Sequence, residues 1–121
     1  MKAGGLSKVE IDETRDRIED SLFAVRAGLA EGYIAGGGVP LYNASQRLTP
    51  ETRPVAGQIG IKIVKEACKE PGIQIIQNAT GSRSKAIQLL SKLSPENPQL
   101  GYNSKTLRFE NLLESGVIDP L

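Results

Sequence analysis

The stretch RIEDSLFAVRAGLAEGYIAGGG, residues 17–38, joins a helical pattern of apolar residues to a glycine-rich ending. Ile18, Leu22, Val25 and Leu29 follow the i, i+4, i+7, i+11 spacing of one helical face. Gly32 comes just after them and is placed to end the helix in a left-handed conformation. The stretch therefore predicts an amphipathic helix that stops before a permissive glycine loop.

The start of this helix is expected at Ser7. Ser7 and Glu10 have the Ser-x-x-Glu spacing of a capping box, in which each side chain satisfies a free backbone N–H of the first turn. We therefore predict a helix over about residues 7–31. Burial of the apolar face would contribute roughly 1.5–3 kcal/mol per side chain, against about 1 kcal/mol for the cap, so packing is expected to decide its stability.

Outward from this stretch, the pattern remains mainly helical. Pro40 suits the first turn of a second helix, because its missing N–H costs nothing there. Residues 49–57 contain two prolines and few apolar side chains, which favours a surface connection. Further helices are expected over about residues 40–48, 59–70, 73–79, 86–93 and 107–114, with extended segments at 102–103 and 117–118 that could pair as a small ribbon.

The bulk composition excludes several classes of function. With 15 basic and 14 acidic residues, the chain has no charge surplus to attract a phosphate backbone, so we expect no nucleic-acid partner. No run of about 18 apolar residues exists, and the start has no signal-peptide core, so no membrane partner is expected.

Cysteine and histidine usage narrows the chemistry further. Cys68 is the one cysteine and there is no histidine, so we expect no disulfide, no transition-metal site and no histidine-assisted nucleophile. Cys68 is expected to be a small buried apolar residue. Any chemistry must come from carboxylates, amides, hydroxyls and the backbone.

Three groups of residues could carry such chemistry, and each has a structural alternative. Asp20 lies about 200° around the helix from Ile18, which is typical of a solvated acidic face. Gly36, Gly37 and Gly38 could present backbone N–H groups to a phosphate, or could simply connect two helices. The polar residues at the two extended segments could meet a ligand, or could serve turns; they are Asn103, Ser104 and Asp119.

The same residues carry a resemblance to a known family. Residues 17–38 are similar to the group I chaperonin segment in which an Arg-x-Glu-Asp-x-Leu helix leads into a glycine triplet. QIGIKIVKEACKEP at residues 58–71 resembles that family's Gly-Ile-Lys helix. GYN at 101–103 and SGVIDP at 115–120 resemble its Gly-Tyr-Asn and Gly-Ile-x-Asp-Pro elements. Four ordered motifs with matching separations support the resemblance.

The resemblance implies an ATP-dependent folding chaperone and assigns roles to single residues. It implies that Asp20 acts on the attacking water, that the glycine triplet contacts the nucleotide through the Gly37 backbone, and that Asp119 bonds the ribose. It also places Asn103 and Ser104 at the adenine, with Val117 beside the base. These roles suit phosphoryl transfer, which needs positioning and charge stabilisation more than covalent chemistry.

The resemblance also implies that this chain is a fragment of a larger protein. The family's phosphate-binding Thr-x-Gly-Pro-x-Gly loop, its magnesium-holding Asp-Gly-Thr-Thr-Thr element and its client-binding apical domain have no counterpart here. Where the family usually has Asn-Ala-Ala, this chain has Asn103, Ser104 and Lys105. We therefore expect ATP with magnesium in the parent protein, but no cofactor bound and no turnover in the fragment alone.

The complete prediction is a mainly α chaperonin fragment with one long helix and a short two-stranded β ribbon. Residues 1–31 would belong to the intermediate domain and residues 32–121 to the equatorial, nucleotide-binding domain. The parent would form a homo-oligomeric ring that receives unfolded proteins and a co-chaperonin, in the bacterial cytoplasm, the mitochondrial matrix or a plastid. The alternative is a stand-alone helical interaction module without nucleotide chemistry.

Overall fold

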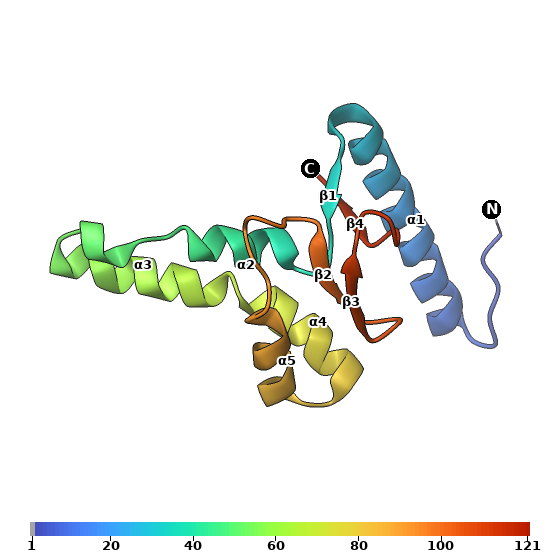
Figure 1. Cartoon of the computed structure of the whole chain (residues 1–121). Helices are drawn as coiled ribbons and strands as arrows, with labels where there is room; N and C mark the ends of the chain where they lie inside the picture. Colours follow the sequence, from blue (N-terminus) through green and yellow to red (C-terminus); the bar gives the residue numbers. More distant parts are fainter. Residues whose placement is uncertain (1) are drawn as a thin grey trace. The chain divides into compact units, whose positions relative to one another are not determined.

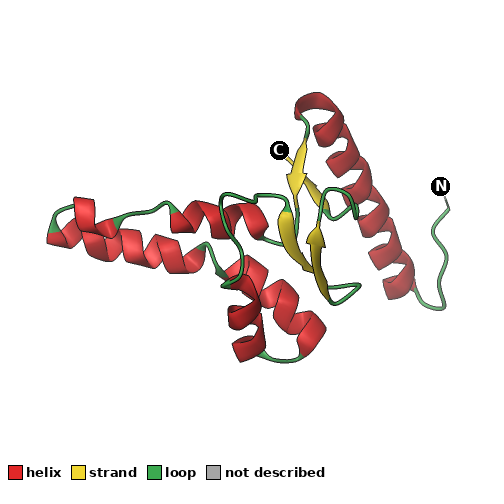
Figure 2. Ribbon diagram, in the orientation of Figure 1, coloured by secondary structure: helices red, strands yellow, loops and turns green. Residues whose placement is uncertain are grey.

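The computed structural model describes residues 2–121, apart from the side chain of Thr52, and it is mainly helical (Figures 1 and 2). It confirms the predicted fold class of helices with a short two-stranded ribbon. The chain forms two compact units, one made of the residues through Tyr33 with residues 119–121, the other of residues 34–118. The elements are α1 (Lys8–Glu31), β1 (Tyr33–Ala35), α2 (Val39–Gln46), η1 (Pro50–Thr52), α3 (Val55–Ala67), α4 (Glu70–Thr80), α5 (Arg83–Leu90), β2 (Leu100–Asn103), β3 (Arg108–Asn111) and β4 (Ile118–Pro120).

The helix α1 dominates the first unit and has the predicted start. The Ser7 hydroxyl accepts a hydrogen bond from the backbone N–H of Glu10 at 3.2 Å, and the Glu10 carboxylate accepts one from the backbone N–H of Leu6 at 2.9 Å. At the other end, Gly32 has φ of +93° and donates its N–H to the carbonyl of Gly28. The predicted helix and the Ser7 half of its capping box are therefore confirmed. Glu10 bonds Leu6 instead of Ser7, and Gly32, with ψ of −171°, does not adopt the left-handed helical conformation expected of it.

The predicted burial of α1 is wrong. No residue of the helix is buried, and the stripe made by Leu22, Val25 and Leu29 is 49%, 59% and 83% exposed. Ile18 is partly buried. The periodicity identified the apolar face correctly, but the unit that holds α1 contains no second layer to cover that face.

The core of the second unit lies where α4 and α5 meet the start of α2 and the strand β2. The helices α4 and α5 lie side by side, joined by a short turn (Figure 1). These two helices supply four of the nine core residues in the described part of the chain. The core residues are Ala35, Val39, Ile73, Ile76, Ala86, Leu90, Leu93, Tyr102 and Leu112.

A bidentate ion pair joins the first turns of α4 and α5. The Arg83 guanidinium donates to both carboxylate oxygens of Glu70, at 2.6 and 3.1 Å. These hydrogen bonds and the positive charge hold the pKa of Glu70 below its ordinary value and raise the pKa of Arg83. The pair bridges two helices that both contribute to the core, although solvent screens it.

The predicted helix over residues 107–114 is wrong, because these residues form the strand β3 and a turn. β3 pairs with β2 in an antiparallel hairpin that places Tyr102 opposite Phe109. Their rings pack edge to face with centroids 5.6 Å apart, and Lys92 lies over the Phe109 ring. This cross-strand contact and the turn between the strands stabilise the hairpin in place of the expected helix.

The extended segment at 117–118 was expected to pair with the one at 102–103, and it does not. β4 pairs with β1 instead, so the structure has two separate two-stranded sheets, drawn in yellow in Figure 2. The backbone N–H of Leu121 donates to the carbonyl of Gly32 at 3.0 Å beside this second sheet. The division between the two compact units runs through both of its strands.

Three smaller expectations also change. The helix expected over about residues 59–70 ends at Ala67, and Pro71 lies in the first turn of the next helix, α4, where proline needs no hydrogen-bond partner. The segment at 49–57 holds η1 and the first residues of α3, so it is less irregular than expected. Cys68 is only partly buried. No helix in the described part of the chain is both long and apolar enough to span a bilayer.

Candidate functional site

The glycine triplet lies between β1 and α2, and each glycine has its own structural reason. A Cβ on Gly36 would come within 3.3 Å of the Val117 backbone, and a Cβ on Gly38 would come within 2.6 Å of the Gly72 backbone. Gly37 meets only ordinary contacts, but its φ of +66° favours glycine. Close packing therefore accounts for the outer two glycines, and backbone conformation accounts for the middle one.

The N–H groups of the three glycines differ in whether they already have a hydrogen-bond acceptor. The N–H of Gly36 donates to the carbonyl of Val117 at 2.9 Å, so it is not available to a ligand. The carbonyls of Gly36 and Gly38 accept from Val39 and Tyr42 at the start of α2. Within the described chain, the N–H groups of Gly37 and Gly38 have no backbone acceptor outside regular structure. Both N–H groups are thus placed for a ligand anion at the start of α2.

The hairpin of β2 and β3 brings Asn103 and Ser104 beside this loop. A Cβ on Gly37 would lie 3.8 Å from the carbonyl oxygen of Tyr102, the residue before Asn103. The hairpin can approach this closely because Gly101 has no side chain, and a Cβ there would lie 2.4 Å from Leu112 and 2.7 Å from Val39. The glycine of the Gly-Tyr-Asn motif is therefore needed for packing. It positions the two polar residues that follow Tyr102.

Asn103 itself shapes the turn of the hairpin. Its side chain is buried, and its Oδ1 accepts hydrogen bonds from the N–H groups of Lys105 and Thr106 at 3.0 and 3.4 Å. Its backbone carbonyl accepts from Leu107, which has a positive φ of 58°. Asn103 therefore has the turn role that was one of its two predicted roles. Its Nδ2 makes no hydrogen bond within the described residues and remains a donor for a ligand.

Two buried polar groups lack a hydrogen-bond partner in the described part of the chain. One is the hydroxyl of Ser104, beside Asn103 at the turn. The other is the carboxamide of Asn43 in α2, which is 7% exposed. Because buried polar groups are normally satisfied, each is a candidate for water or ligand contact. The sequence analysis singled out Ser104 and missed Asn43. The sequence signal for Asn43 was a polar amide in the middle of a short, partly apolar helix.

Val117 and the glycine loop are also brought together by the structure. Val117 packs against the core cluster, donates its N–H to Leu112 at 2.9 Å and accepts from Gly36 at the same distance. The second unit therefore collects the glycine loop, the hairpin turn and Val117 around the N-terminal end of α2. These groups can supply a backbone donor, amide and hydroxyl groups and an apolar contact.

The two carboxylates of the predicted site belong to the other unit. Asp20 is exposed on α1, as the acidic-face interpretation expected, and Asp119 is exposed in β4. The structure therefore does not unite the carboxylates with the glycine loop in one compact unit. Among the described residues, no three side chains of the metal-binding kinds come together. We assign no magnesium ligand to this chain.

The comparisons with known proteins bear on the whole chain. The sequence model of the TCP-1/cpn60 chaperonin family matches residues 1–121. A protein described as chaperonin GroEL, from Methanospirillum hungatei JF-1, is 40% identical to this chain over 120 residues. The match covers 99% of this chain and 22% of that relative, so the chain spans less than a quarter of the relative's length.

Proposed function

The chain belongs to the TCP-1/cpn60 chaperonin family, and from this premise we propose that it is part of an ATP-dependent chaperone that assists protein folding. The observation that supports this most strongly is the 40% identity to chaperonin GroEL over 99% of the chain. The alternative of a stand-alone interaction module is not favoured, because the family match extends over all of the residues.

Within that role, we assign the second unit to the adenosine side of a nucleotide site. The Gly37 N–H can meet a phosphate oxygen, while Asn103 Nδ2 and the Ser104 hydroxyl can meet polar atoms of the base. Val117 offers an apolar contact beside the base. We also propose that Asp119, which belongs to the other unit, accepts hydrogen bonds from ribose hydroxyls. The resemblance of the four motifs supports these roles, and the grouping of the glycine loop, hairpin turn and Val117 is compatible with them.

Asp20 is proposed to act on the water that attacks the terminal phosphate. A carboxylate can orient a water molecule and take up its proton, provided that the helix carrying it can approach the nucleotide. Asp20 is exposed and lies in a different compact unit from the glycine loop, which is compatible with such an approach. ATP brings magnesium to the parent protein, where residues outside this chain would hold the metal.

The proposed domain assignment follows from these roles. Residues 1–31 form the intermediate-domain segment, and residues 32–121 form part of the equatorial domain. The parent assembles as a ring of like subunits, and it receives unfolded proteins and a co-chaperonin through parts outside this chain. Depending on the source, the parent works in the bacterial cytoplasm, the mitochondrial matrix or a plastid.

Experiments on the isolated chain test whether it can hydrolyse ATP without the rest of the parent protein. We expect calorimetry with ATP and magnesium to give at most weak binding, and a phosphate-release assay to give no turnover. The reason is that the groups that hold the phosphates and the metal lie elsewhere in the parent. Appreciable hydrolysis by the isolated chain that survives Asp20→Ala would contradict the proposal.

A further inference from the structure

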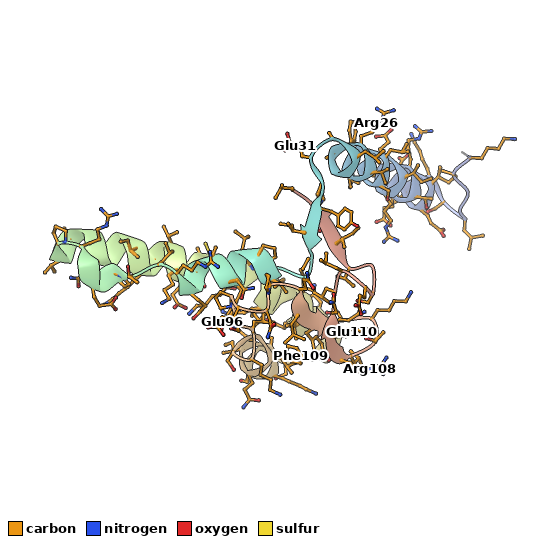
Figure 3. All side chains as sticks on the ribbon, turned by 45° about the horizontal axis from the view of Figure 1, so that its top comes forward. Arg26, Glu31, Glu96, Arg108, Phe109 and Glu110 are labelled. Atoms are coloured by element: carbon orange, nitrogen blue, oxygen red, sulfur yellow. The ribbon has the colours of Figure 1, made fainter. Side chains whose placement is uncertain are left out.

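We draw no further inference here: the strongest candidate, the exposed apolar face of α1 whose side chains project outward in Figure 3, carries nothing because nothing in the structure shows what covers it.

Discussion

At the scale of single residues, the glycine triplet shows that neighbouring glycines can be required for different reasons. Gly36 and Gly38 leave no room for a side chain, because the Val117 and Gly72 backbones approach them. Gly37 has space but a left-handed backbone. The nucleotide role proposed for the triplet therefore rests on the N–H groups of Gly37 and Gly38, while Gly36 and Gly38 also pack against the Val117 and Gly72 backbones.

Gly38→Ala should destabilise the second unit by about 2–4 kcal/mol, because a Cβ would meet the Gly72 backbone and φ is +77°. Urea unfolding would measure this loss. Gly81→Ala is the matched control, since Gly81 has a similar φ of +74° but open space around its Cβ position. It should cost about 1 kcal/mol. Equal losses in the two variants would show that contact with Gly72 does not matter.

The sequence predicted the environment of some residues and not of others. Ile73, Ile76 and Ala86 are buried on helices that the apolar spacing predicted. Asp20 is exposed together with the apolar stripe on the opposite face of α1, so its exposure does not depend on its angle to that stripe. The buried hydroxyl of Ser104 could not be predicted, because it depends on how the hairpin turn closes. Local sequence patterns determine which face of a helix is apolar. Contacts between distant segments determine which polar groups are buried away from water.

At the scale of elements, the helix ends were more predictable than the packing. The capping box of α1 involves residues three positions apart, so the sequence contains all of the information needed. The strand β3 was missed because its stability comes from Tyr102, seven positions before Phe109, and from the turn that Asn103 closes.

The Glu70–Arg83 ion pair predicts a pH dependence at this scale. Because the pKa of Glu70 is lowered in the folded state, its contribution is present above the unfolded pKa and is lost as pH falls through the folded pKa. Glu70→Gln should therefore be less stable than the original chain at pH 7, and the difference should close at an acidic pH below the folded pKa of Glu70.

A double-mutant cycle isolates that interaction. In an Arg83→Gln background, Glu70→Gln should have little further effect on urea unfolding at either pH, because the partner that lowers the pKa of Glu70 is gone. If the pH-dependent difference persists without Arg83, some group other than this guanidinium stabilises the carboxylate.

At the scale of the whole molecule, the chain consists of two units whose surfaces are unequally covered. The second unit has a core of its own, whereas α1 exposes most of its apolar stripe. The sequence could identify that stripe but not what covers it, because the spacing of apolar residues does not show which segment packs against them. The same reasoning explains why the carboxylates Asp20 and Asp119 could be listed with the glycine loop but not placed against it.

The central claim is that this segment supplies the water-activating carboxylate and the adenosine side of a chaperonin ATPase site. It is tested most directly by exchanging the matching segment of the Methanospirillum hungatei relative for this chain and measuring ATP binding and phosphate release. Asp16→Ala serves as the control, since Asp16 is also an exposed acid of α1. We predict that Asp20→Ala retains ATP binding but lowers phosphate release by at least about a hundredfold, while Asp16→Ala changes neither. Unchanged phosphate release in Asp20→Ala, or an equal loss in Asp16→Ala, would contradict the account.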